Sequence, residues 1–175
     1  MMTKTSIPNR RAEVGQALPE FALLVPLLFL MLFGVIQFGF TLSGQIGLTN
    51  AAREAARYAA TVPNTTSAAV LTELTTRQMP KAIPGFRAAN VVTGAAGSSV
   101  IYCAVANPNN SASYPSFSIR ARVNAAYRHP LLIPFIGALV DAIDGTTDNA
   151  LTARATEEMR VENPRLTSDG GLPPC

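Results

Sequence analysis

Residues 14–40 read VGQALPEFALLVPLLFLMLFGVIQFGF, and this stretch decides the fold. From Phe21 to Ala52 the chain has no Lys, Arg, Asp or Glu. Because about 20 apolar residues span the hydrocarbon core of a bilayer as a helix, this run is long enough to cross a membrane once. A buried core helix of this length would carry a polar face, yet no polar side chain follows Phe21 until Gln37. The sequence therefore predicts a single transmembrane helix.

Most of the excess of basic over acidic residues lies within residues 1–15, ahead of the apolar run. The chain has 14 Lys and Arg against 11 Asp and Glu, and Lys4, Arg10 and Arg11 precede the run. The remainder is nearly neutral, so we expect no nucleic-acid partner. Since basic flanks of membrane helices stay in the cytoplasm, we expect the N-terminus there and everything after about residue 45 outside it.

The apolar run does not resemble an ordinary cleaved secretory signal. Such a signal would be shorter and would be followed closely by a small-x-small cleavage site. Here the run continues in helical register through TLSGQIGLTNAAREAARYAAT, Thr41–Thr61. We therefore expect one continuous helix that leaves the membrane and extends outside it.

A short motif ahead of the run carries a family resemblance. GQALPEF, Gly15–Phe21, resembles the processing site of type IVb prepilins: a Gly, four variable residues, a Glu and an aromatic residue. FGVIQFGF and LTNAAREAARYAAT resemble the N-terminal helix of TadE-like proteins, minor pilins or pseudopilins of the tight adherence (Tad, or Flp) pilus. The clear similarity covers Val14–Thr61; a weaker one, including ALTARATEEMRVENP, covers Phe117–Pro164. Pro19 departs from the pattern, although Pro is tolerated in a first helical turn.

This resemblance implies cleavage by a prepilin peptidase between Gly15 and Gln16. Glu20 would then be the fifth residue of the processed chain, and Glu20 and Phe21 would serve assembly. A paired amine and carboxylate on neighbouring subunits offset each other's charge in a low-dielectric setting. The alternative is that the helix dipole alone favours Glu20, by about 0.3–1 kcal/mol.

The implied organisation has three parts: a leader (1–15), a transmembrane and extended helix (16–61), and an extracytoplasmic α+β domain (62–175). The resemblance implies a bacterial cytoplasmic (inner) membrane protein that can also enter the pilus. Its implied partners are the membrane, the prepilin peptidase, other Tad pilins and the assembly platform, and its implied roles are pilus assembly and adhesion. The alternative from another class is an unprocessed single-pass anchor for an extracytoplasmic binding domain.

Small residues recur at every fourth position beyond the apolar run. Such a ridge lets helices approach closely. We expect the ridge from Ala51 onward to pack on the protein's own sheet, and Gly39–Gly47 to be available to a partner helix. The ridge comprises Gly39, Ser43, Gly47, Ala51, Ala55 and Ala59.

The remaining sequence predicts a short helix and a small antiparallel sheet. TSAAVLTELTTRQM, Thr66–Met79, has helical spacing, whereas NVVTG (Asn90–Gly94) and SSVIYCAVA (Ser98–Ala106) have strand composition. SFSIRARVNAAY, Ser116–Tyr127, alternates apolar and polar residues. ALTARATEEM, Ala150–Met159, does the same. Three or four strands are expected.

In these two alternating strands, the side chains expected to face inward are Phe117, Ile119, Ala121, Val123, Leu151, Ala153 and Ala155. The predicted fold class is α+β and pilin-like, with a long amphipathic helix laid across the apolar face of the sheet.

One apolar stretch allows two interpretations. HPLLIPFIGALVDAI, His129–Ile143, is too short to span a membrane and is interrupted by Pro134. We favour a cap over the domain core. The alternative is a patch that faces the membrane or another subunit.

The two cysteines, Cys103 and Cys175, both lie on the expected extracytoplasmic side. An oxidising compartment permits a disulfide that would pin the Gly- and Pro-containing tail to the sheet. The alternative is a buried Cys103 with a Cys175 that is free or links two subunits.

No catalytic constellation is apparent in the sequence. It lacks a nucleotide-binding loop, a nucleophile elbow and paired-Cys zinc spacing, and His129 is its only histidine. We expect no enzyme activity, no cofactor, no metal and no small-molecule substrate, which argues against a secreted hydrolase on a signal anchor.

Overall fold

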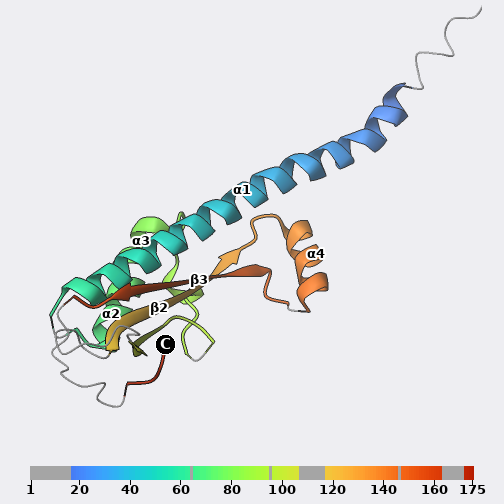
Figure 1. Cartoon of the computed structure of the whole chain (residues 1–175). Coiled ribbons are helices and arrows are strands. Elements are labelled where there is room, and N and C mark those ends of the chain that lie inside the picture. The colour runs from blue at the N-terminus through green and yellow to red at the C-terminus, as the bar shows by residue number, and fades with distance from the viewer. Residues whose placement is uncertain (1–16, 64, 95, 107–116, 146, 163–171) are drawn as a thin grey trace, which may run out of the picture.

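The computed structural model describes residues 17–63, 65–94, 96–106, 117–145, 147–162 and 172–175. One very long helix lies across a small antiparallel sheet and extends far beyond it (Figure 1). This arrangement confirms the predicted α+β fold.

Helix α1 spans Ala17–Thr61, 45 residues, and Pro63 follows its end. Its first half is apolar on every side and exposed, and only 6% of its most apolar window is buried. Within the described ranges it is the one helix long and apolar enough to cross a membrane. A core helix of a soluble domain would be mostly buried, so this exposure favours a membrane anchor.

The second half of α1 lies along one face of the sheet (Figure 1). Its alanines have small side chains, which allow the helix to approach the strands closely and to fill the space without voids. The prediction that this part of the ridge packs on the protein's own sheet is confirmed. The alanines exposed by 2% or less are Ala51, Ala52, Ala55, Ala56 and Ala59, and the larger side chains around them include Leu48, Val70, Leu74, Met79, Val123 and Tyr127.

The membrane-proximal part of the small-residue ridge differs from the expectation. Gly47 is buried against the backbone of Ala82, and Gly44, outside the ridge, is buried against the ring of His129. Gly39 and Ser43 are exposed. A partner helix therefore has access to the first part of Gly39–Gly47 but not to Gly47 itself.

The predicted short helix after α1 is present but irregular. Helix α2 spans Ser67–Glu73, and the Thr66 side chain caps it by accepting a hydrogen bond from the Ala69 N–H. A π-helical turn, η1, follows over Leu74–Gln78, and α3 covers Met79–Ala82. Pro80 has no N–H and its ring would crowd the carbonyl four residues earlier in a regular α-helix. The wider π turn directly before it accommodates this proline.

Three strands form the sheet in the order β1-β2-β3, with both pairs antiparallel. They are β1 (Ser99–Ala106), β2 (Phe117–Pro130) and β3 (Ala150–Arg160). Val123 at the centre of β2 pairs with Val100 on β1 and with Glu157 on β3. Ile119, Ala121 and Val123 are buried as the alternation predicts, because this face lies under α1.

The prediction of a strand at Asn90–Gly94 is wrong. A single 3₁₀ turn, η2 (Ala88–Asn90), leads into two isolated bridges, Val91 to Tyr127 and Thr93 to Ser98. Strand β1 pairs with β2 only as far as Asn124. Beyond Asn124, Val91 and Val92 pair with the same edge of β2 instead. Gly94, with φ of 95°, turns the chain back before a longer strand can form.

Leu151 lies on the predicted face of β3, with Ala153 and Ala155, but it is not buried. It is 38% exposed, whereas Ala153 and Ala155 are buried as expected. Leu151 pairs with His129 at the end of the sheet, where the ring of His129 occupies the space against α1.

Helix α4 spans Pro134–Asp144 and ends at Gly145, which has φ of 73°. The favoured interpretation of this stretch, a cap over the core, is wrong. None of the described side chains of α4 belongs to the hydrophobic core, and Phe135, Leu139 and Ile143 are exposed. The helix projects at the end of the sheet nearer to the apolar half of α1 (Figure 1).

Candidate functional site

The expected assembly residues lie at the start of α1. Glu20 is in its first turn, where the free N–H groups and the helix dipole favour a carboxylate, and it is exposed. Phe21 beside it is 66% exposed. Both side chains are therefore open to contact with another molecule. Gly15 and Gln16, the expected cleavage pair, lie outside the described residues.

An apolar surface surrounds α1 beyond Glu20. Large apolar side chains point outward on all sides, as expected for a helix in lipid and not for one that packs along a single stripe. The most exposed members include Leu23, Leu24, Leu28, Met31, Val35 and Phe38. A carboxylate at the edge of such a surface is costly unless it is paired or reaches water.

Gln37 connects this apolar surface to the domain. Its side chain is 4% exposed, and its Oε1 accepts a hydrogen bond of 2.9 Å from the N–H of Leu132. In the sequence, Gln37 stands out only as the first polar residue after Phe21. A lone amide in an apolar run was the sequence signal for this contact, because a polar group in apolar surroundings needs a hydrogen-bond partner.

His129 fills the space beside Gly44 of α1. Its ring packs edge-on against Tyr127, with centroids 4.9 Å apart, and its Nε2 is buried without a hydrogen-bond partner among the described residues. Burial lowers the pKa of His129 below its usual 6.5, since desolvation disfavours the charged ring. The neutral ring therefore packs like an aromatic side chain, as a structural residue does.

Polar contacts join α1 to β3, an edge strand of the sheet. Arg53 on α1 forms an ion pair of 3.0 Å with Glu157 of β3, and the Gln45 amide donates to the carbonyl of Arg154 at 2.9 Å. Arg53 is largely exposed, so this pair contributes little to stability compared with the buried alanines. Its effect is to hold the orientation of the helix.

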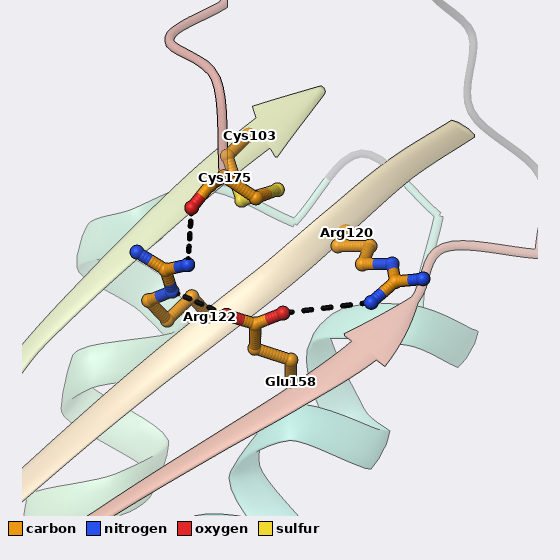
Figure 2. The surroundings of a disulfide bond; sticks show 5 residues. All are labelled: Cys103, Arg120, Arg122, Glu158 and Cys175. Atoms are coloured by element: carbon orange, nitrogen blue, oxygen red, sulfur yellow. Dashed lines mark hydrogen bonds and ion pairs between the residues drawn. A yellow bond between two sulfur atoms is a disulfide. The ribbon is translucent and has the colours of Figure 1, made fainter. Parts of the chain in front are cut away.

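Cys103 and Cys175 form a disulfide in the structure, with Cα atoms 5.0 Å apart (Figure 2). The tail also pairs with β1 through its backbone. The Ala104 N–H donates to the Pro173 carbonyl at 3.0 Å, and the Cys175 N–H donates to the Ala104 carbonyl at 3.3 Å. The end of the chain is thus attached to an edge that would otherwise be open for pairing.

Charged side chains surround the disulfide on the outer face of the sheet. Figure 2 shows Glu158 of β3 between Arg120 and Arg122, and Arg122 also donates to the carbonyl oxygen of Cys175. Glu158 accepts a hydrogen bond from Arg122 and forms an ion pair with Arg120, so one carboxylate partly neutralises two guanidinium groups. In the described part of the chain, no three His, Cys, Asp or Glu side chains are placed to hold a metal ion.

A comparison with protein families bears on the N-terminal segment and α1. The family described as TadE-like protein matches residues 15–57, from the expected cleavage glycine to the part of α1 on the sheet. This segment is TadE-like. The resemblance found in the sequence is confirmed over that range, and the TadE-like family is a pilus-associated family and not one of enzymes. Comparisons with curated proteins and with solved structures give no match.

Proposed function

We propose that this protein is a prepilin-processed minor pilin or pseudopilin of a Tad (Flp, type IVb) pilus that takes part in pilus assembly and adhesion. One observation carries the proposal: within the TadE-like segment, α1 has an exposed apolar half, and its second half packs on a small sheet. The first half anchors the chain in the inner membrane. The second half presents the domain outside the cytoplasm, while the basic residues ahead of Gly15 stay inside.

Cleavage after Gly15 changes the electrostatics at the start of α1. Hydrolysis of the Gly15–Gln16 peptide bond removes the basic leader and creates an α-amine four residues from Glu20. In a filament, the amine of one subunit and Glu20 of its neighbour pair in the low-dielectric space between apolar helices. The exposed Phe21 and the apolar surface beside Glu20 supply the helix contacts.

The cleavage step is tested at Gly15. In cells that also express a Tad-type prepilin peptidase, the wild-type chain should lose residues 1–15, and Gly15→Leu should stay uncut. A leucine side chain obstructs a tight peptidase cleft that a residue without Cβ enters. Intact mass spectrometry of the purified chain measures the outcome. Ala12→Leu adds the same type of side chain in the leader and should be cut normally.

Two results would contradict the proposal: a wild-type chain that keeps residues 1–15, or a Gly15→Leu chain that is trimmed equally well. An uncut wild-type chain would favour the unprocessed membrane-anchored binding protein.

The pairing step is tested at Glu20. Glu20→Ala should leave cleavage and membrane insertion intact but reduce co-purification with other Tad pilins more than tenfold. Removing one partner of a buried ion pair costs about 3–5 kcal/mol because the other charge is left unpaired. Affinity pull-down and counts of surface pili measure the loss.

Glu54→Ala is the matched control for Glu20→Ala, because Glu54 lies on the same helix and pairs only locally with Arg57. If Glu20→Ala assembles as well as Glu54→Ala, the pairing role is wrong and the helix dipole is sufficient to explain Glu20.

A further inference from the structure

Helix α4 has an apolar face that no described part of the protein covers. Leu132 just before the helix and Phe135, Leu139 and Ile143 within it are 64%, 65%, 56% and 79% exposed. Within the helix, the spacing of four residues places Phe135, Leu139 and Ile143 on one side. Ala138 and Ala142 are exposed as well. An apolar stripe of this kind on a surface indicates contact with a partner or a membrane.

The opposite side of α4 is attached to the domain. Gly137 is buried next to the side chain of Asn149, and the Asp141 carboxylate accepts a hydrogen bond from the Asn149 N–H at 3.2 Å. The start of the helix is held through Leu132, whose N–H donates to Gln37 of α1. The exposed stripe is therefore fixed in direction relative to α1.

The Gln37 contact sets the level of α4 along the membrane helix. At 1.5 Å per residue, about 20 residues cross a hydrocarbon core of about 30 Å, so a span that begins at Phe21 ends near Phe40. Gln37 then lies within one turn of the outer boundary. Figure 1 shows α4 beside this part of α1, beyond the end of the sheet.

We propose that α4 lies in the outer interface of the same bilayer that α1 crosses, with Leu132, Phe135, Leu139 and Ile143 inserted among the lipid acyl chains. The inference rests on the proposed membrane span of α1. The start of α4 is tied to α1 at the level of Gln37, where the surface of α1 is apolar and exposed, so lipid that surrounds α1 at this level also reaches the stripe. Interfacial helices bury an apolar face at this depth in the same way.

The chemistry of the stripe predicts which lipid property matters. Between Leu131 and Asp144 there is no Lys or Arg, and the acidic residues are Asp141 and Asp144. Binding should therefore come from acyl-chain contact and should not require anionic headgroups. As a consequence, the domain is held at a fixed height and tilt against the membrane, and α4 must leave the lipid when a subunit enters a filament.

Tryptophan fluorescence in vesicles tests this placement, because the chain has no Trp. Full-length Phe135→Trp is reconstituted in phosphatidylcholine vesicles at no more than about one chain per vesicle, with and without bromine on the acyl chains. We expect a blue-shifted emission that brominated lipid quenches several-fold more than it quenches Val62→Trp at the far end of α1. Ile143→Trp, at the most exposed position of the stripe, should behave like Phe135→Trp.

Phe29→Trp, inside the apolar half of α1, separates this inference from the proposed span. If Phe29→Trp is not quenched, the span itself is wrong. If Phe29→Trp is quenched while Phe135→Trp and Ile143→Trp resemble Val62→Trp, only the placement of α4 is overturned. Emission that is blue-shifted without quenching, or only when chains are crowded, would show that a protein surface covers α4 and would also overturn the inference.

Discussion

Replacing both Cys103 and Cys175 by alanine should lower the free energy of unfolding of the domain by about 2–5 kcal/mol. The disulfide joins residues separated by 72 positions, so it removes many conformations from the unfolded chain. It also holds the tail in backbone pairing with Ala104 on β1. Alanine is chosen because Cys103 is 1% exposed and a serine hydroxyl there would need a partner. Pulse proteolysis in urea, with the full chain in detergent micelles, measures the change.

Reduced wild type is the matched control, because it breaks the same bond without changing the side chains. It should unfold close to the double variant. Equal stability of the oxidised wild type and the double variant would contradict the prediction. Free alkylation of both thiols without reductant, or a linkage only between chains, would show that the bond does not form within the native chain.

The sequence carries a strong signal for the parts of the fold that depend on local pattern. The apolar run from Phe21 and the alanine spacing from Ala51 are sufficient to predict a helix with a lipid-facing half and a packed half. The alternation in β2 predicts its buried face correctly, since a strand under a helix must be apolar on one side. The resemblance of the motif at Gly15 to a prepilin processing site is likewise a property of the sequence, and Gly15 lies outside the described residues.

The role of α4 could not be derived in the same way. An apolar stretch such as LLIPFIGALV has the same composition whether it covers a core or faces lipid. The choice depends on how much of the core α1 and the short helices already fill, and on the long-range contact between Gln37 and Leu132. The exposure of Leu151 was missed for a related reason, because the period of a strand gives the face of a residue and does not show that the ring of His129 occupies the space against α1 there.

Replacing Gly47 by alanine should lower the free energy of unfolding by about 1–3 kcal/mol, the usual cost of overpacking. A Cβ at this position would lie 2.1 Å from the carbonyl oxygen of Ala82 and 3.3 Å from the Cα of Ile83. Both are backbone atoms, so no side-chain rotation can relieve the clash, and α3 must move away from α1. The same proteolysis measurement on the full chain reports the effect.

Gly39→Ala is the matched control, because it makes the same change on the same helix where no atom lies within 4 Å of the added Cβ. It should leave stability unchanged or raise it by up to about 1 kcal/mol, the helix preference of Ala over Gly. Comparison of the two variants also decides how the small-residue ridge is used. One outcome would contradict the prediction: Gly47→Ala is as stable as Gly39→Ala but fails to associate with other pilins. The glycine at position 47 would then be required by a partner helix and not by packing against α3.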